Sequence, residues 1–369
     1  MPVVGGPDIE LTFATAHAVL ALTVFVAPGA IALVVEPIVF LLADRYPRRW
    51  FIRAGLAGMS LGAFGAALAP GPIALAIALG FSYIASGTCT ALAQATLVDR
   101  FADERARALT RWTLWSVAGD MLAPALLAAL ALAGASWRWG FVAIGVLLLV
   151  WLAALSAASF EVSAPKDDEE EADATPAKGL WATLKDAITD PLLVAWLFGT
   201  ALCDLLDEIL VIFASLHLRI DLHAGPFWQS LAVAAFTAGD ALGLVALERL
   251  LKTRSERNLL AICAVGCIVA YVPWLLAPTP LAATLLAIPV GMFVGPLYPL
   301  AAAQAYACRP NQSGSVLAAG HLFTPLGLIL PFAIGALADA AGTTAALAVL
   351  VVQPLGLLLL VALTRRNSA

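Results

Sequence analysis

Apolar stretches of about 20 residues recur along almost the whole chain, and each is long enough to cross the roughly 30 Å hydrocarbon layer of a bilayer. Hydrophobic residues make up 62% of the 369 residues, and charged residues only 12%. A soluble domain of this length carries about 25% charged residues, so this chain lacks an adequate water-facing surface. The pattern predicts an all-α membrane protein rather than a β-barrel, whose strands would give short alternating segments.

Eleven transmembrane helices are predicted from these runs. Short breaks with turn-forming residues, such as "APGP" (69–72) and "APTP" (277–280), separate several of them. The predicted helices cover residues 13–43, 51–69, 72–98, 108–133, 138–160, 190–217, 227–250, 258–276, 280–307, 313–337 and 344–363.

One break differs from the others. Residues 161–179 read "EVSAPKDDEEEADATPAKG", which is acidic, rich in Pro and Ala, and without helical periodicity. This composition favours a flexible, solvated spacer, with a calcium or partner-binding site as the alternative. We therefore expect an N-terminal transmembrane bundle over 1–160, an acidic linker over 161–189, and a six-helix bundle over 190–369.

The Lys and Arg residues predict the orientation. If the spans alternate in direction, eighteen of the twenty fall on one side of the membrane, and only Arg138 and Arg219 fall on the other. Cytoplasmic loops of membrane proteins carry the excess of Lys and Arg. The linker and the C-terminus are therefore predicted to be cytoplasmic, in the inner (plasma) membrane of a bacterium.

The two halves of the sequence repeat each other. Four short matches occur in the same order, at offsets of 204, 208, 210 and 201 residues. They pair "EPIVFLLADR" (36–45) with "DALGLVALER" (240–249), "ALAPGP" (67–72) with "LLAPTP" (275–280), "ALAQA" (91–95) with "AAAQA" (301–305), and "GDMLAP" (119–124) with "GHLFTP" (320–325). The span at 190–217 has no counterpart, so the repeat predicts a 6+6 plan whose first helix is missing, which leaves 5+6. A misassigned or truncated start and a real eleven-helix protein are the two explanations.

Two segments resemble signatures of the major facilitator superfamily of secondary transporters. "FLLADRYPRR" (40–49) resembles the loop Gly-x-Leu-x-Asp-Arg-x-Gly-Arg-Arg at the cytoplasmic end of the family's second helix, with Phe40 and Pro47 in place of its glycines. "SWRWGF" (136–141) resembles the start of the last helix of the N-terminal half. The resemblance covers essentially the whole chain and implies two pseudo-symmetric helical bundles that give alternating access to a central site.

The resemblance also implies a cytoplasmic gate. Asp44 and Arg45 would hold the gate loop by pairing with a neighbouring helix end when the transporter faces outward. Arg48 and Arg49 would add further cytoplasmic contacts. The second copy of the loop retains the acid–arginine pair, as Glu248 and Arg249.

Other family marks are poorly matched. Many proton-coupled members carry an arginine in the fourth helix, and this chain has none near Tyr83. Only Gly119 and Pro124 remain from the Gly-Pro signature of drug antiporters, so a drug/proton antiporter is not supported.

Seven ionisable residues lie in the interior of the predicted spans, away from the span ends, and are the candidates for coupling or substrate binding. A charged side chain at the centre of a membrane helix costs roughly 2.5–3.5 kcal/mol, so these residues are expected to face a cavity, to be protonated, or both. They are Glu36, Asp120, Asp204, Asp207, Glu208, Asp240 and His321.

Three of these acids form a cluster. Asp204, Asp207 and Glu208 are spaced i, i+3 and i+4, so they share one helical face. Like charges repel, so at least one of the three is expected to be protonated near neutral pH. We expect the cluster to handle protons or cations and to face Glu36 or Asp120 across a cavity.

The repeat makes Glu36 equivalent to Asp240, and Asp120 equivalent to His321. For the first pair, bracing of the two gate helices is the alternative to a role in the pathway. For the second pair, the alternative is a satisfied buried polar group. No Lys or Arg lies in the membrane interior, which favours cationic, zwitterionic or neutral amphipathic cargo over anions.

The sequence therefore predicts a transporter that uses alternating access and acts as a monomer in the lipid bilayer, and it does not predict an enzyme, because no Ser/His/Asp or metal-ligand motif is recognisable. Its expected partners are a small-molecule substrate and protons, or sodium in place of protons, with no nucleic acid. No cofactor or metal is expected, because no His or Cys pair near the five cysteines completes a ligand set. The alternatives are a non-transporting receptor or assembly factor with the same fold, and an intramembrane enzyme.

Overall fold

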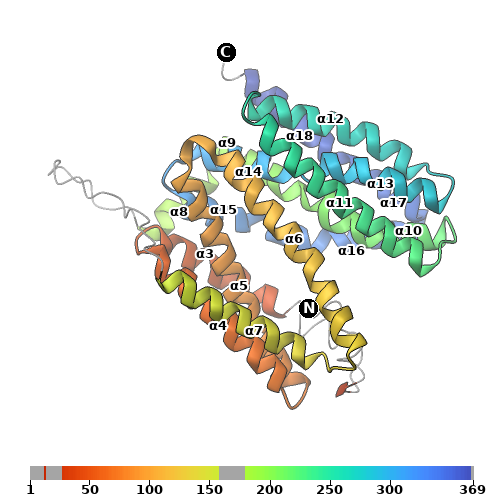
Figure 1. Ribbon diagram of the computed structural model, residues 1–369. Coiled ribbons are helices and arrows are strands. Elements are labelled where there is room, and N and C mark those ends of the chain that lie inside the picture. The colour runs from red at the N-terminus through yellow and green to blue at the C-terminus, as the bar shows by residue number, and fades with distance from the viewer. Residues whose placement is uncertain (1–11, 14–26, 158–178, 367–369) are drawn as a thin grey trace. The chain divides into compact units, whose positions relative to one another are not determined.

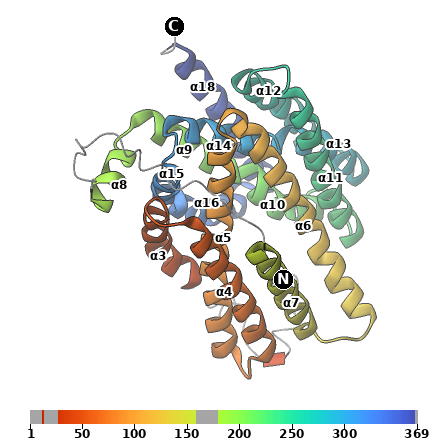
Figure 2. The ribbon, with the colours of Figure 1, turned by 60° about the vertical axis from the view of Figure 1, so that its left-hand side comes forward.

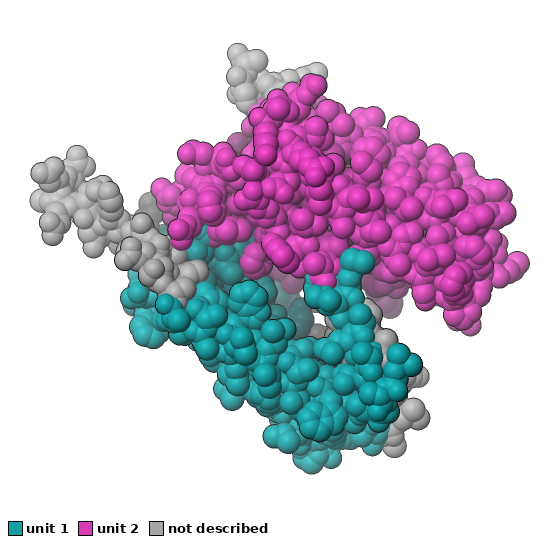
Figure 3. Space-filling view, viewed as in Figure 1, with its two compact units in different colours: residues 1–96, 119–185, 312–318 teal, residues 97–118, 186–311, 319–369 magenta. Residues whose placement is uncertain are grey.

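The computed structural model describes residues 12–13, 27–157 and 179–366, and the regular structure within them is helical. The chain divides into two compact units, coloured separately in Figure 3. Unit 1 contains residues 1–96, 119–185 and 312–318, and unit 2 contains residues 97–118, 186–311 and 319–369. Most of the predicted N-terminal bundle therefore lies in unit 1, and most of the C-terminal bundle lies in unit 2. Two segments are exchanged: residues 97–118 of the N-terminal half belong to unit 2, and residues 312–318 of the C-terminal half belong to unit 1.

Unit 1 is built around four long helices, which run side by side in Figures 1 and 2. They are α3 (Ala27–Ala43), α4 (Arg48–Leu68), α5 (Pro72–Arg100, up to residue 96) and α7 (Arg138–Ala157). Small residues let α4 and α5 pack closely, since a Cβ on Gly62 would lie 2.8 Å from the carbonyl oxygen of Ala78. Close approach through small residues is typical of membrane helices.

The remaining helices of unit 1 are shared or short. They are the second part of α6 (Arg105–Leu132), most of α8 (Leu180–Ile188) and the start of α15 (Ser313–Gly320). The sequence did not predict α8, whose Leu180 and Leu184 pack against a cluster around Phe40 and Leu92 while Trp181 is exposed. The acidic segment 161–178 and residues 14–26 of the first predicted span lie outside the described residues.

Unit 2 holds the helices of the C-terminal half, with η2 (Ala102–Glu104) and the first part of α6. These helices are α9 (Pro191–Leu202), η3 (Leu205–Ile209), α10 (Leu210–Ile220), α11 (Pro226–Leu250), α12 (Glu256–Leu275), α13 (Pro280–Val294), α14 (Leu297–Cys308), η4 (His321–Phe323), α16 (Thr324–Ala341), α17 (Thr343–Ala348), η5 (Val349–Val351) and α18 (Val352–Arg366).

Local sequence signals explain where several helices begin. Pro191 and Pro280 occupy first positions, where a missing N–H costs nothing. The side chain of Asp190 accepts from the backbone N–H groups of Leu192 and Leu193 at 3.0 and 3.2 Å, which caps α9. At the opposite end of a helix, Arg138 donates to the carbonyl oxygens of Ala67, in the last turn of α4, and of Ala69, directly after it.

Every predicted span contains a helix of the structure. Among the described residues, eight helices are by themselves long and apolar enough to cross a membrane. They are Arg48–Leu68, Pro72–Arg100, Arg138–Ala157, Pro226–Leu250, Glu256–Leu275, Pro280–Cys308, Ser313–Ala341 and Thr343–Thr364. The predicted span at 190–217 is interrupted by η3, and α3 is shorter than its predicted span. The total of eleven spans therefore stays a prediction.

Candidate functional site

The acidic cluster lies at an interruption of a membrane helix in unit 2. The α-helix ends at Leu202, a single π-helical turn covers Leu205–Ile209, and the α-helix resumes at Leu210. Within this turn, the N–H of Leu210 bonds to the carbonyl of Leu205, five residues back. Such π-turns inside α-helices are often found at functional sites.

The interruption separates charged from apolar residues. Asp204, Asp207 and Glu208 are all exposed, so the three share the unpacked face of their helix. The four residues between and after them pack into unit 2, and these are Leu205, Leu206, Ile209 and Leu210. Among the described residues, no three His, Cys, Asp or Glu side chains converge as the ligands of one metal ion would.

A side chain from another helix bonds to this turn. The backbone N–H of Leu206 donates to Oε1 of Gln353, on α18, at 2.8 Å. Gln353 is completely buried. Gln353 could not be identified from the sequence, because a single glutamine in an apolar run has no motif around it.

Glu36 and Asp240 are each buried within their own unit, with only 7% and 5% of their surfaces exposed. Glu36 on α3 lies against Gly87 on α5, where a Cβ would overlap the carboxylate. Asp240 on α11 lies against Gly295, just after α13, where a Cβ would overlap its carboxylate in the same way. The two acids, which the repeat makes equivalent, therefore have equivalent glycine neighbours, 208 residues apart.

Asp120 and His321 differ in their surroundings. Asp120 is exposed on α6, in the part of that helix that belongs to unit 1. His321 is half-buried in η4 of unit 2, and its Nδ1 lies 3.3 Å from Oγ1 of Thr324. The repeat predicted these positions as a pair, and the structure gives them different degrees of burial.

The predicted gate loop makes contacts within unit 1. The carboxylate of Asp44 accepts from the backbone N–H groups of Gly314 and Ser315 at 2.9 and 2.8 Å, at the start of α15. Arg48 donates to the same carboxylate at 2.9 Å. Burial raises the pKa of Asp44, while Arg48 and the two N–H groups act in the opposite direction. The neighbouring Arg45 and Arg49 are exposed.

The second copy of the loop makes a similar contact in unit 2. Oε1 of Glu248, near the end of α11, accepts from Nε of Arg111 on α6 at 2.8 Å. Nε of Arg107 lies 3.7 Å from the same oxygen, and Arg249 is exposed. Arg107 and Arg111 are among the eighteen Lys and Arg residues that were predicted to be cytoplasmic, without a predicted partner. The missed pairing had no local signal, because its partners are 137 residues apart.

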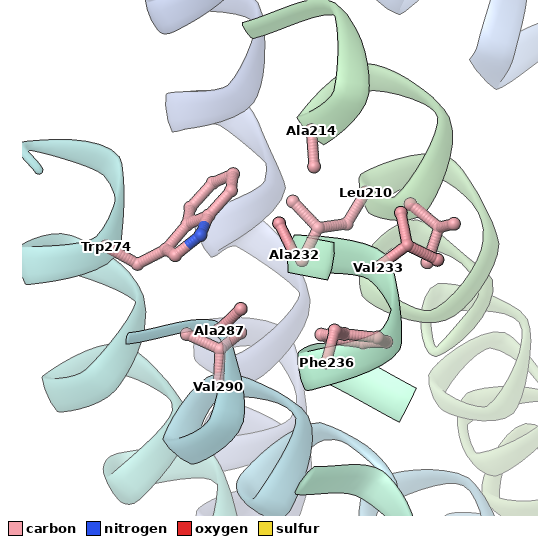
Figure 4. A pocket seen from close by; sticks show the side chains of 9 residues that line it. Leu210, Ala214, Ala232, Val233, Phe236, Trp274, Ala287 and Val290 are labelled. Carbon is pink, nitrogen blue, oxygen red and sulfur yellow. The ribbon is translucent and has the colours of Figure 1, made fainter. Parts of the chain in front are cut away.

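Unit 2 also contains an apolar pocket, on the packed side of the interrupted helix (Figure 4). Leu210, which follows the π-turn, and Trp274 from α12 point into it. The pocket is lined by Leu210, Val211, Ala214, Ala232, Val233, Phe236, Trp274, Ala287 and Val290. None of these nine side chains is charged, so this pocket is separate from the acidic cluster.

Comparisons with known proteins identify one family. Residues 2–203 match the family described as Major Facilitator Superfamily. No curated protein sequence matches the chain.

Solved structures share the fold. An Escherichia coli fucose:proton symporter, FucP, is similar with a TM-score of 0.78 and 13% identity, over 97% of this chain and 93% of that one. A bacterial homologue of the iron transporter ferroportin, in an outward-facing state, has a TM-score of 0.71 and 16% identity, over 99% and 94%. The proton:xylose symporter XylE has a TM-score of 0.65 and 14% identity, over 94% and 86%. At these identities the likeness shows the fold alone.

Proposed function

The chain belongs to the major facilitator superfamily and is an integral membrane transporter, and from this premise we propose that it moves a small cationic, zwitterionic or neutral amphipathic molecule by alternating access, driven by protons. The proposal rests mainly on the acidic cluster. Asp204, Asp207 and Glu208 are exposed at an interruption of a membrane helix whose other face is packed with leucine and isoleucine.

The free-energy cost of placing a charge in lipid indicates what the acidic cluster faces. If the three carboxylates faced lipid, each would cost roughly 2.5–3.5 kcal/mol when ionised. We therefore infer that their face lines a water-filled part of the transport pathway. Polar and ionisable residues inside membranes commonly mark ion or substrate pathways.

The same crowding supports a proton as the driving ion. Three carboxylates within about one helical turn repel each other when all are ionised, so one of them readily holds a proton. A group that gains and loses a proton near neutral pH is suited to coupling. The names of two solved relatives, a fucose:proton symporter and a proton:xylose symporter, favour the same ion. Sodium is the alternative.

The charge balance supports the class of cargo. The cluster contributes up to three negative charges, and the sequence has no Lys or Arg in the interior of its spans to offset them. A pathway with this balance repels phosphates and organic anions and admits cations, zwitterions and neutral molecules.

The contacts of Asp44 and Glu248 support a gate. Asp44 joins the end of α3 to the start of α15, and Glu248 joins α11 to α6. Each contact links a segment of one sequence half to a segment of the other. We infer that the two contacts close the cytoplasmic side in one state and break when the transporter changes state.

Transport of simple probes into liposomes tests the proposal. The purified chain is reconstituted with a pH-sensitive dye inside, and choline, glycine betaine, L-fucose and glucose 6-phosphate are added outside in turn. We expect at least one of the first three to move protons with it and to accumulate along a pH gradient. Transport of the anionic sugar phosphate alone would contradict the cargo class. Accumulation driven by a sodium gradient at equal pH would contradict proton coupling.

A further inference from the structure

In the interrupted helix of unit 2, the backbone N–H of Leu206 donates to a side chain and not to the carbonyl that a continuous helix would offer. In a continuous α-helix, the N–H of Leu206 would bond to the carbonyl of Leu202. Instead it donates to Oε1 of Gln353, a residue 147 positions later in the chain. Just before it, the N–H of Cys203 bonds to Thr200, three residues back. The glutamine therefore bonds to the helix at the point where its regular pattern fails.

The orientation of the Gln353 amide follows from chemistry. A backbone N–H is only a donor, so it must meet the amide oxygen and not the NH2 group. This arrangement turns Nε2 away from Leu206, and within the described part of the chain Nε2 has no hydrogen-bond partner. A buried amide whose NH2 group makes no hydrogen bond costs folding free energy, because that group has lost its water. The bond from Leu206 to its oxygen offsets part of this cost.

The packing of α18 against α9 brings the glutamine within reach. A Cβ on Gly199 of α9 would lie 2.7 Å from Cδ1 of Leu360, and a Cβ on Gly356 of α18 would lie 3.0 Å from Cδ1 of Leu202. The two glycines therefore let α9 and α18 approach closely within the first turns that follow Gln353 on α18. Close approach in this part of unit 2 is required for a side chain of this length to bond to a backbone donor.

From these contacts we propose that Gln353 is a positioning residue of the coupling site: its oxygen holds the π-turn in place and thereby sets the spacing of Asp207 and Glu208 relative to Asp204. The proposal rests on the proposed function of the three acids. Without an acceptor at position 353, the N–H of Leu206 would have to return to Leu202. That return would restore regular helix and rotate the two later acids about the helix axis.

Three variants of the full chain, in lipid nanodiscs, test the proposal. Gln353→Met keeps the length of the side chain and removes the oxygen acceptor. Gln353→Glu keeps an oxygen acceptor, whether or not it is protonated. Gln304→Met is the matched control, because Gln304 is also a buried glutamine of unit 2 but bonds to Arg257 and Glu256. Gln353→Leu, which also lacks an acceptor, replaces Gln353→Met if that variant does not fold.

Hydrogen exchange measured by mass spectrometry reports on the bond itself. We expect the amide of Leu206 to exchange about five- to tenfold faster in Gln353→Met, as for the loss of one typical hydrogen bond. Gln353→Glu and Gln304→Met should leave this rate within about twofold of the native chain. An unchanged rate in Gln353→Met would overturn the proposal.

Carbodiimide labelling reports on the position of the acids and needs no cargo. The pH midpoint for labelling Asp207 is expected to move by about one unit in Gln353→Met, a tenfold change in proton affinity. Gln353→Glu should restore the native midpoint, and Gln304→Met should not move it. Faster exchange at Leu206 with an unchanged midpoint would overturn the positioning role. A native chain that transports no probe would instead count against the proposed function. The labelling result does not depend on transport and would still test the role of Gln353.

Discussion

Asp44 and Ser315 lie 271 residues apart in the chain, yet Oδ2 of Asp44 accepts a hydrogen bond from the backbone N–H of Ser315 at 2.8 Å. The carboxylate thereby serves as the cap of α15, whose first N–H groups have no partners within the helix. The sequence resemblance implied that this loop pairs with a neighbouring helix end. In unit 1, Asp44 bonds to the start of α15, and a gate role for this contact stays a prediction.

Glycine is required at position 314 by this close approach. A Cβ there would overlap both the carboxylate of Asp44 and the carbonyl oxygen of Phe40, and the second is backbone that cannot turn away. We expect Gly314→Ala to lower the thermal unfolding midpoint of the detergent-purified chain by several degrees, equivalent to about 1–3 kcal/mol for overpacking.

Gly320, at the other end of α15, provides the matched control. A Cβ there would lie 3.6 Å from Cδ2 of Leu197, an ordinary contact. Gly320→Ala should therefore leave the midpoint unchanged or raise it slightly. Equal losses in the two variants would show that helix α15 tolerates no added methyl group anywhere, and the contact with Asp44 would not explain the loss.

The charge of Asp44 is predicted to matter less for stability than its oxygen atoms. Burial raises the pKa of Asp44, so the ionised form is held at some cost at neutral pH. Asp44→Asn keeps one of the two acceptor oxygens of the cap and should lower the unfolding midpoint less than Asp44→Ala, which should cost about 0.5–2 kcal/mol. Thermal unfolding of both variants at pH 7 checks this. A larger loss in Asp44→Asn than in Asp44→Ala would contradict it.

A polar cluster beyond α10 predicts a pH dependence of stability. Asp221 lies 2.5 Å from Nδ1 of the buried His217 and accepts from the hydroxyl groups of Thr343 and Thr344. Burial acts to raise the pKa of Asp221, but the bonds from Thr343, His217 and Thr344 outweigh it and lower the pKa. A lowered pKa means that the carboxylate stabilises the fold above its ordinary pKa of about 3.9, and that this stability is lost as the pH falls further.

The Asp221→Asn variant isolates this effect. The native chain should lose stability faster than Asp221→Asn as the pH is lowered from about 5 to about 3, because the variant has no carboxylate to protonate there. Thermal unfolding over this pH range measures the difference. Parallel curves for the two chains would contradict the role of Asp221.

The sequence predicted the helices of this fold well, because its strongest signals are local. Hydropathy located a helix within every predicted span, although it missed the short helix α8. The spacing of Asp204, Asp207 and Glu208 predicted a shared face, and all three are exposed together. The family, recognised from the loop at 40–49, is confirmed.

The π-turn and its partner could not be predicted in this way. Residues 205–209 contain no Gly or Pro, so nothing local marks an interruption. Its stability depends on Gln353, which the chain brings near only after α18 has packed. The burial of Glu36 and Asp240 is similar, since it depends on Gly87 and Gly295 in other helices.

The central claim, that the acidic cluster couples transport to protons, is tested most directly by Asp207→Asn. The change keeps the shape of the side chain and removes its titrating group. Asp103→Asn is the control, because Asp103 is exposed in η2, outside the acidic cluster.

Both variants and the native chain are reconstituted with the probe that the native chain accumulates. Accumulation along a pH gradient and exchange of labelled for unlabelled probe without a gradient are then measured side by side. We predict that Asp207→Asn abolishes gradient-driven accumulation and retains exchange, while Asp103→Asn retains both. Gradient-driven accumulation by Asp207→Asn at the native rate per folded molecule would contradict the claim.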